Sequence, residues 1–225
     1  MHKPQRLRPG GRIGVLAPAG TVDSLSIQAG VDAIRARGYE VELGANLFAS
    51  AGYLAGEARA RAQDLLQFFR RPDIDAIFCA RGGFGSVQLL PYLSADLSNH
   101  AKIFVGYSDV TTLLNWLCQS CRMVAFHAPM VATDLARGLS ERGNAHLWHL
   151  LDGTMIDWKL ALGDTIRPGR AEAEMIGGCL SILVTTLATP HEIDTRGKLL
   201  FLEDVGERPY RIERMLTHLQ MAGKL

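Results

Sequence analysis

Short apolar runs alternate with segments of helical length between Arg12 and His127, and this alternation restricts the fold more than any other feature of the sequence. Four of the runs have the length and composition of buried β-strands, whereas residues 39–43 alternate between apolar and polar side chains like a half-buried strand. The runs occupy residues 12–17, 39–43, 76–80, 102–106 and 123–127. Strands that alternate with helices form a parallel sheet whose two faces the helices cover, with right-handed crossovers. We therefore predict an α/β domain built on a parallel sheet.

Three of the intervening segments carry helix signals. Residues 25–34 have apolar side chains at helical spacing, and we expect Ser24 to cap this helix and Gly38 to end it. Residues 57–70 are rich in Ala, Arg, Leu and Gln and are followed closely by a proline, which predicts a second helix. A further helix is predicted to begin near Val110.

The sequence changes in character after about residue 150, which indicates a second structural unit. Asp152 and Gly153 are predicted to end a helix. The elements expected beyond a linker-like stretch are a helix over residues 180–187, a strand over 198–203 and a helix over 210–221. We predict an N-terminal α/β domain at residues 1–150, a linker at 151–170 and the first part of a C-terminal domain at 171–225.

Charge and hydropathy exclude several classes of partner. A formal net charge of +1, with basic residues scattered along the chain, gives no reason to expect nucleic acid or an acidic membrane. The N-terminus has no apolar stretch behind its positive charges, so no secretion signal is predicted. The longest uncharged stretch, residues 175–191, contains two adjacent glycines and is shorter than the ~20 residues of a spanning helix. We expect a cytoplasmic protein.

The four cysteines include a C-x-x-C pair, Cys118 and Cys121. This pair follows the predicted helix, at the end where the helix dipole disfavours a thiolate. A zinc site needs two further ligands at suitable spacing, and no second Cys or His pair offers them. We interpret the cysteines as reduced thiols without a role in the chemistry.

Ser108 is the candidate nucleophile. The residues Gly-Tyr-Ser-Asp at 106–109 join a predicted strand to a predicted helix, and a serine on such a turn is exposed at the sheet edge. The backbone N–H of Asp109 is then able to point at a developing oxyanion. The alternative is that Asp109 only caps the helix. The motif lacks the second glycine of the G-x-S-x-G elbow.

Two more motifs lie at predicted strand ends. Arg-Gly-Gly-Phe-Gly at 81–85 resembles an anion-binding loop but matches neither common nucleotide-binding glycine pattern. Its paired glycines suit the second half of an oxyanion hole or, equally, a tight turn before a helix. Glu203 and Asp204 end another strand, and alternation sends them to opposite faces. Either one of them faces the site or both are solvated acids.

Together these motifs resemble the LD-carboxypeptidases, the muramoyltetrapeptide carboxypeptidases and related microcin-immunity peptidases. The resemblance runs from about Arg8 to the last residue. It is carried by Arg-Gly-Gly-Phe-Gly-Ser (81–86), Tyr-Leu (92–93), Gly-Tyr-Ser-Asp (106–109), His-Ala-Pro-Met (127–130), Gly-Gly-x-Leu-Ser (177–181) and Leu-Phe-Leu-Glu-Asp-Val-Gly-Glu-x-Pro-Tyr-Arg-Ile (200–212).

The resemblance implies a flavodoxin-like N-terminal domain, a swivelling β-barrel C-terminal domain and a homodimer. It implies a Ser–His–Glu triad with Ser108 as nucleophile and Glu203 orienting the base, and an oxyanion hole formed by the N–H groups of Gly83 and Asp109. The implied reaction is removal of the terminal D-alanine from an L,D-linked muropeptide tetrapeptide in cytoplasmic cell-wall recycling. No metal or cofactor is expected. We expect Arg81 to bind the substrate carboxylate, with a structural salt bridge as the alternative.

The catalytic histidine is the main departure from the family pattern. None of the seven histidines lies at a matching position, so we expect the chain to stop before this residue or to have lost it. The 225 residues alone are then expected to be nearly inactive. His127 ends a strand beside that of Ser108 and is expected to line the pocket. Cys179 and Ala128 stand where the family usually has Asn and Gly.

Three other functions stay open at this stage. A microcin-immunity-type peptidase uses the same machinery to cut an acyl-sulfamate or a related peptide-nucleotide. A degenerate homologue binds muropeptide without cleaving it. A nucleotide-binding α/β domain is the third, and the glycine pattern does not favour it.

Overall fold

A five-stranded parallel sheet forms the centre of the first part of the chain, in the order β2-β1-β3-β4-β5. The computed structural model describes residues 1–154 and 163–225. The strands are β1 (Arg12–Leu16), β2 (Glu40–Leu43), β3 (Ala76–Cys79), β4 (Ile103–Gly106) and β5 (Phe126–His127). The predicted α/β class with a parallel sheet is therefore confirmed.

β5 is shorter than the predicted strand over residues 123–127. Met123 forms a bridge with His2 instead, and the N–H of Val124 donates to the carbonyl of His2 at 3.0 Å. The N-terminal residues therefore take the hydrogen bonds that a longer β5 would have made with β4. Composition alone does not reveal this competition.

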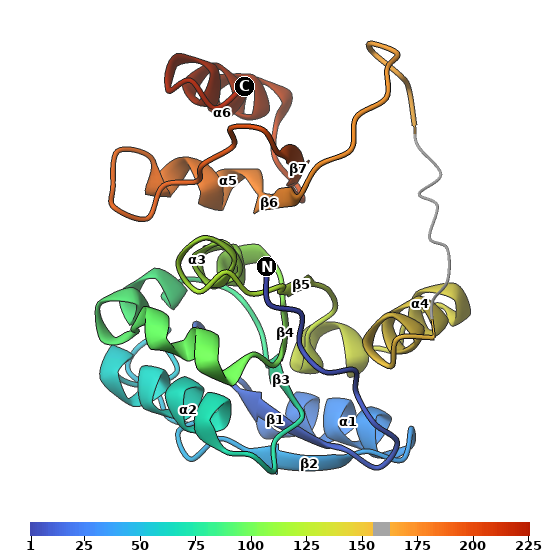
Figure 1. The fold of residues 1–225 in the computed structure, drawn as a ribbon. Coiled ribbons are helices and arrows are strands. Elements are labelled where there is room, and N and C mark those ends of the chain that lie inside the picture. Colours follow the sequence, from blue (N-terminus) through green and yellow to red (C-terminus); the bar gives the residue numbers. More distant parts are fainter. Residues whose placement is uncertain (155–162) are drawn as a thin grey trace.

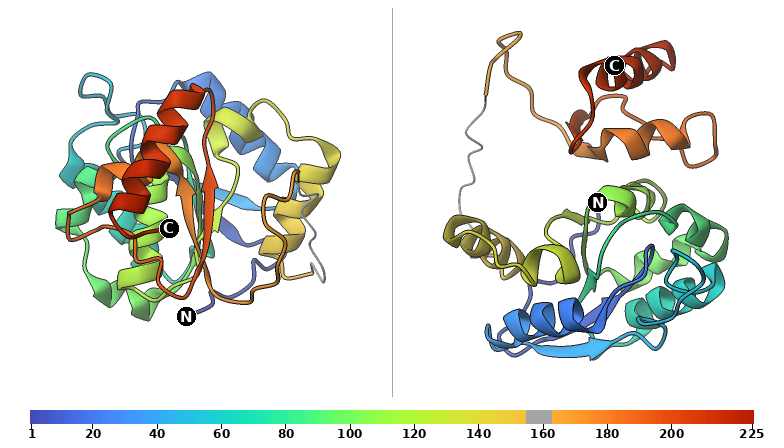
Figure 2. Two further views of the ribbon diagram at one scale, coloured as in Figure 1. Left: turned by 90° about the horizontal axis from the view of Figure 1, so that it is seen from above. Right: turned by 180° about the vertical axis from the view of Figure 1, so that it is seen from behind.

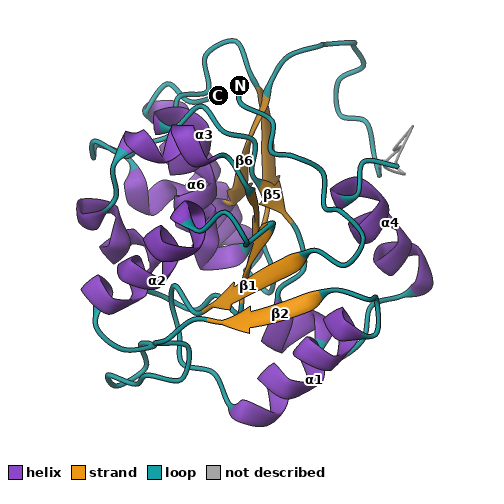
Figure 3. Ribbon diagram, turned by 60° about the horizontal axis from the view of Figure 1, so that its bottom comes forward, coloured by secondary structure: helices purple, strands orange, loops and turns teal. Residues whose placement is uncertain are grey.

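Helices cover both faces of the sheet (Figures 1 and 3). α1 (Ser24–Arg35) and α4 (Glu141–Leu151) lie on one side, and α2 (Ala58–Arg70) and α3 (Thr111–Ser120) on the other. Successive strand residues alternate between the two resulting cores: Ile77 packs with α2 and α3, and Phe78 packs with α1 and α4. Burial on both faces explains why β3 and β4 are continuous apolar runs and β1 nearly so, whereas the edge strand β2 is less buried and alternates.

The predicted cap of α1 was wrong by one residue. The carboxylate of Asp23 accepts a hydrogen bond from the N–H of Ser26 at 2.8 Å, and Ser24 is the first helical residue. A carboxylate also interacts favourably with the positive end of the helix dipole, which a serine hydroxyl does not. Short helices of other types lie in the connections: η1 (Ser86–Tyr92), η2 (Ala95–His100), η3 (Ser108–Val110) and the π-helix η4 (Val131–Leu135).

The last part of the chain forms a two-stranded parallel sheet of β6 (Met175–Cys179) and β7 (Leu199–Glu203). The prediction missed β6, because glycine is unfavourable inside a strand and two adjacent glycines lie in this one. The helix predicted over residues 180–187 is α5 (Leu180–Leu183) followed by the 3₁₀ turn η5 (Val184–Thr186), and the last helix is α6 (Pro209–Met221). Part of the predicted linker, residues 155–162, lies outside the described residues, and the domain boundaries stay a prediction.

The second sheet rests on α3 of the first part (Figures 1 and 2). Thr111 accepts a hydrogen bond through its Oγ1 from the N–H of Cys179 at 3.1 Å. Asn115 donates from Nδ2 to the carbonyl of Gly177 at 3.1 Å and accepts from the N–H of Gly177 at 3.3 Å. Both side chains are buried, so these bonds fix the position of β6 on the helix.

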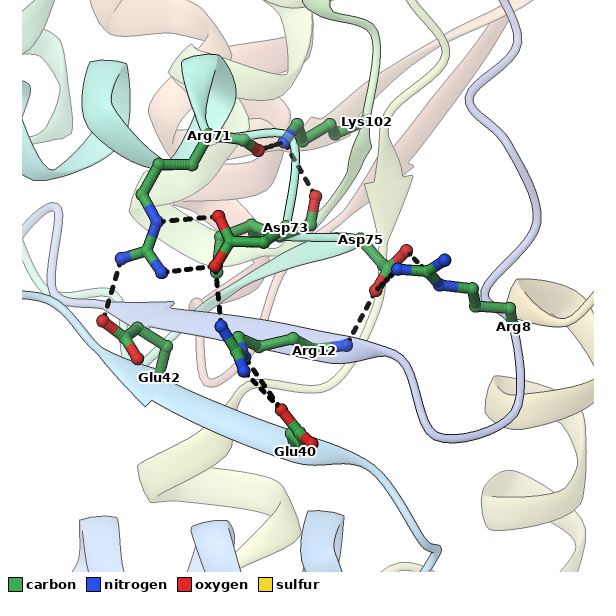
Figure 4. Close-up of polar contacts among 9 residues, drawn as sticks. Arg8, Arg12, Glu40, Glu42, Arg71, Asp73, Asp75 and Lys102 are labelled. Atoms are coloured by element: carbon green, nitrogen blue, oxygen red, sulfur yellow. Dashed lines mark hydrogen bonds and ion pairs between the residues drawn. The ribbon is translucent and has the colours of Figure 1, made fainter.

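Charged side chains gather at the amino ends of the strands (Figure 4). Arg71 pairs with Glu42 at 2.8 Å and with Asp73 at 2.7 Å, and Arg12 bonds Glu40 and Asp73. The other members of this charge cluster are Arg8, Asp75 and Lys102. The cluster lies at the end of the sheet opposite to the motif loops, so it serves the fold and not the candidate site. No helix in the described ranges is long and apolar enough to cross a membrane.

Candidate active site

The loops with the predicted site residues leave neighbouring strands at one edge of the first sheet. β3 ends at Cys79 and leads into the glycine loop, which we define as residues 80–85. β4 ends at Gly106, two residues before Ser108. β5 ends at His127, which lies opposite Gly106 in the ladder. Open α/β sheets bind ligands at the carboxyl ends of their strands, so this edge is the candidate site.

Ser108 has a left-handed backbone conformation, with φ of 59°. This region is uncommon for a residue that is not glycine, and such strain concentrates at functional sites. The tight turn depends on Gly106, since a Cβ atom there would lie 2.7 Å from Cγ1 of Val110. Within the described residues the Ser108 hydroxyl has no hydrogen-bond partner. The turn therefore presents a partly exposed, unpaired hydroxyl at the sheet edge.

Backbone amides lie beside this hydroxyl. A Cβ atom added at Gly82 would lie 3.2 Å from Oγ of Ser108 and 3.4 Å from the backbone nitrogen of Asp109, so the glycine loop and the serine turn are in contact. In the described parts of the chain, neither the N–H of Gly83 nor that of Asp109 donates a hydrogen bond. An oxyanion hole requires unpaired N–H groups close to the nucleophile, so these two groups of the adjoining loops are its candidate donors.

The side chain of Asp109 turns away from α3. Its Oδ2 accepts the N–H of Ser86 at 2.9 Å, and neither η3 nor α3 has a side-chain cap. The interpretation of Asp109 as a helix cap is therefore wrong. Burial raises the pKa of Asp109, and the hydrogen bonds from Ser86 oppose this rise. The backbone carbonyl of Asp109 in turn accepts Oγ–H of Ser86 at 2.5 Å.

Glu203 reaches the same region from the second sheet. Its Oε1 lies 3.6 Å from Nε2 of His127, and the imidazole packs between the rings of Tyr107 and Phe201, with centroids 5.9 and 5.3 Å away. The contact is too long for a hydrogen bond. Oε1 is buried and has no hydrogen-bond partner among the described residues. A buried carboxylate oxygen without a hydrogen bond lowers the stability of the fold, so its presence needs an explanation. Glu203 is therefore a candidate to accept a hydrogen bond from a catalytic group.

Burial shifts both groups toward their neutral forms. It raises the pKa of Glu203, with a smaller contribution from the charge of Asp204, and it lowers the pKa of His127. Asp204 turns elsewhere, because its Oδ2 accepts the N–H of Ser181 at 2.8 Å. The expected separation of the two adjacent carboxylates is thus observed, and Glu203 is not a freely solvated acid.

Arg81 lies at the exposed rim of the glycine loop. Its Nη1 donates to the carbonyl of Thr21 at 3.2 Å. It makes no ion pair with another residue in ranges 1–154 and 163–225, so the salt-bridge alternative is not supported there. Its role toward a carboxylate stays a prediction.

The cysteines are free thiols. Burial raises the pKa of Cys121 to about 11 and also raises that of Cys118, which disfavours the thiolate that redox chemistry needs. Within the described residues, no group of three or more His, Cys, Asp or Glu side chains is arranged to hold a metal ion.

Sequence reasoning missed the residues that hold the site together. Thr111 and Asn115 dock the second sheet on α3, and the available signal was the spacing of these two polar residues, four apart on one face of the predicted helix. Arg61 was missed in the same way, since it lies on the buried stripe of α2 beside Leu65.

Comparisons with known proteins show which family this chain resembles. Models of the LD-carboxypeptidase N-terminal and C-terminal domains match residues 13–128 and 172–225. A probable murein peptide carboxypeptidase of Bacillus subtilis (strain 168) is 41% identical over 229 residues, covering 100% of this chain and 72% of that protein. The crystal structure of a muramoyltetrapeptide carboxypeptidase from Oxalobacter formigenes is 32% identical, with a TM-score of 0.84 over 95% of this chain and 72% of that one. An MccF-like protein from Bacillus anthracis (strain Ames) has a TM-score of 0.88 at 23% identity, over 98% and 76% of the two chains, and this likeness shows the fold alone.

Proposed function

Because this chain belongs to the LD-carboxypeptidase family, we propose that it is a serine carboxypeptidase that removes the terminal D-alanine from an L,D-linked muropeptide tetrapeptide. The nucleophile of this proposal is Ser108. The observation that carries it is the left-handed turn at Ser108, where the hydroxyl, which has no hydrogen-bond partner among the described residues, lies beside the glycine loop and the backbone nitrogen of Asp109.

The reaction is acyl transfer in two steps. Oγ of Ser108 attacks the carbonyl carbon of the penultimate residue while a base takes its proton, and the N–H groups of Gly83 and Asp109 stabilise the oxyanion. The amide bond breaks, the leaving nitrogen takes a proton, and D-alanine departs. Water then attacks the acyl-enzyme and releases the shortened peptide. In this scheme Arg81 binds the free carboxylate that distinguishes a carboxypeptidase substrate.

Glu203 is proposed to orient the base. An unpaired carboxylate oxygen is suited to accept the N–H of an imidazole and fix its tautomer. The base itself is the histidine that the family resemblance implies, and its position stays a prediction. His127 lies against the same oxygen without a hydrogen bond, so we propose that it lines the pocket beside Glu203.

The test measures D-alanine release from a muropeptide tetrapeptide by the complete gene product. Ser108→Ala is expected to lower kcat by more than about 10³-fold, because the nucleophile is lost. Ser94→Ala, at an exposed serine, is the matched control and is expected to retain wild-type activity. A serine-directed phosphonate is expected to add one label, mapped to Ser108 by mass spectrometry. Full activity of Ser108→Ala, or a label elsewhere, refutes the proposed nucleophile.

The choice of substrate is tested in the same assay. The similarity to a muramoyltetrapeptide carboxypeptidase at 32% identity favours muropeptide over the peptide-nucleotides of microcin-immunity enzymes. We expect a higher kcat/KM for the tetrapeptide than for an aminoacyl sulfamate of a nucleoside. The reverse order supports the immunity-type function. Binding of tetrapeptide without turnover supports the degenerate homologue.

We also propose that the protein acts in the cytoplasm, in peptidoglycan recycling, and that it forms a homodimer. Sedimentation of the complete gene product tests the second point, with a mass twice that of one chain as the expected result. Cell fractionation tests the first, and recovery in the periplasmic fraction refutes it.

A further inference from the structure

We propose that Arg61 is a positioning residue for the oxyanion hole: its buried guanidinium ties together three loops at the carboxyl edge of the sheet and thereby holds the glycine loop against the Ser108 turn. Arg61 itself lies inside α2 and has no place in the reaction scheme. The inference rests on the proposed function of Ser108.

The Arg61 side chain is buried among apolar residues, with only 1% of it exposed. It lies on the stripe of α2 that also buries Ala62, Leu65 and Phe69. Burial lowers the pKa of Arg61, while the charges of Asp109 and Glu57 oppose this, and an arginine keeps its proton in such an environment. A buried guanidinium is tolerated only where its N–H groups have hydrogen-bond acceptors. The acceptors of Arg61 therefore indicate what this side chain does in the structure.

The partners of the guanidinium come from three loops. Nη1 donates to the carbonyl of Pro18, which follows β1, and to the carbonyl of Gly85 at 2.9 Å, at the end of the glycine loop. Nε donates to the carbonyl of Gly56 at 3.2 Å, ahead of α2. Nη2 donates to Oε1 of Gln88 at 2.7 Å. One rigid fork therefore sets the spacing of these loops.

The approach of the guanidinium to the glycine loop depends on Gly85. This residue has φ of 125°, a conformation that other residues rarely adopt. A Cβ atom there would lie 3.0 Å from Nη1 of Arg61 and 2.6 Å from Cδ2 of Leu54. Glycine is thus required at position 85 for two reasons, the backbone conformation and the close approach of the Arg61 guanidinium.

One residue, Ser86, connects the loop position that Arg61 fixes at Gly85 to the turn of Ser108. Ser86 follows Gly85 and is fully buried. It makes the two hydrogen bonds to Asp109 described above, one to the carboxylate and one to the backbone carbonyl. The charge of Arg61 also acts on the buried carboxylate of Asp109. Both proposed oxyanion donors, the N–H groups of Gly83 and Asp109, therefore lie within two residues of this network.

Replacing the Arg61 guanidinium is expected to weaken stabilisation of the transition state more than binding of the substrate. The proposed donors must meet the oxyanion within a few tenths of an ångström, and a displacement of about 1 Å costs on the order of 10²-fold in rate. Arg61→Lys keeps the charge but presents a single ammonium in place of the planar fork. We expect it to lower kcat about 10- to 100-fold with KM within about twofold of wild type.

The experiment compares Arg61→Lys with Arg59→Lys in the complete gene product. Arg59 is exposed on the same helix, and its substitution is expected to leave kcat unchanged. The readouts are kcat and KM for D-alanine release and the rate at which a phosphonate labels Ser108. The labelling rate is expected to fall in parallel with kcat, because the phosphonyl oxygen needs the same donors. A role of Arg61 in stability alone moves the Tm and leaves both rates of the folded enzyme unchanged.

Ser86→Ala makes the test decisive if Arg61→Lys does not fold. It removes only the bond from Oγ to the carbonyl of Asp109 and is expected to lower kcat about tenfold at constant KM. Wild-type kcat and labelling rates in the folded Arg61→Lys protein, or in Ser86→Ala where the former is unfolded, overturn the inference. Activity of Ser108→Ala overturns the proposed function instead, so the two failures are distinguishable.

Discussion

Gly82 is the position where one added methyl group tests the site most directly. In Gly82→Ala the new Cβ would lie 3.2 Å from both Cβ and Oγ of Ser108 and 3.4 Å from the nitrogen of Asp109. Carbon atoms pack without strain at about 3.5–4.0 Å, so the serine must move by a few tenths of an ångström. Gly82 does not have the left-handed φ of Gly83, so an alanine backbone fits there.

The expected loss follows from the space that the methyl group occupies. A substrate carbonyl must approach Oγ to about 3–3.5 Å, with its oxygen between the two amides. Displacing one oxyanion donor costs about 10²–10³-fold. We therefore expect kcat/KM for D-alanine release to fall about 100-fold in Gly82→Ala, while overpacking lowers stability by about 1 kcal/mol and Tm by about 2–4 °C.

The control for this change is Gly169→Ala. A Cβ atom at Gly169 meets no atom within 4 Å and needs no left-handed backbone, so kcat/KM and Tm are expected to stay at the wild-type values. If folded Gly82→Ala retains kcat/KM within about threefold of wild type, the substrate does not approach Ser108 from the glycine loop. The placement of the oxyanion hole is then refuted.

Three further perturbations test other parts of the structure. Gly177→Ala places a Cβ atom 1.9 Å from the carbonyl oxygen of Phe201, at φ of 136°, so urea unfolding is expected to show a loss of more than about 2 kcal/mol. Burial lowers the pKa of His127, so this residue binds more protons in the unfolded state and its contribution to the free energy of unfolding rises with pH up to about 6.5; His127→Gln removes this contribution. Arg71→Gln breaks the partly exposed pairs with Glu42 and Asp73 and is expected to lower Tm at low salt but less at 1 M NaCl.

Each of these expectations has an outcome that contradicts it. Wild-type stability of Gly177→Ala means that β6 and β7 do not pair in the register described. An unchanged difference in unfolding free energy between pH 5 and pH 7.5 in His127→Gln means that this imidazole is solvated. A Tm loss in Arg71→Gln that is equal at low and high salt assigns the effect to packing and not to charge.

The central strands β1, β3 and β4 were predictable because they are buried on both faces. Residues such as Ile77 and Phe78 point to opposite cores, so the whole strand must be apolar and is visible in the sequence. The same logic located the candidate site, since parallel strands bring their carboxyl ends to one edge. The contacts of the side chains at that edge were not predictable, because they join residues far apart in the sequence.

The errors have local physical causes. β6 was missed because Gly177 and Gly178 have a low strand propensity, whereas the structure needs glycine there for the close approach of β6 to Phe201 and Thr111. The cap was misassigned because Asp23 and Ser24 are both good caps, and only the backbone conformation separates them. The role of Arg61 was not predicted, because the carbonyls that accept its hydrogen bonds belong to distant loops.

The same helix serves both halves of the candidate site. α3 begins directly after the turn of Ser108, and its first two turns carry Thr111 and Asn115, which bond the backbone of β6. β6 pairs with β7 so that Cys179 lies opposite Glu203. The hydroxyl and the unpaired carboxylate are therefore connected by a single rigid helix and one strand pair. Because hydrogen bonds to buried backbone groups resist sliding, the second sheet cannot shift along α3 without breaking them, and this explains how residues from separate parts of the chain keep a fixed geometry.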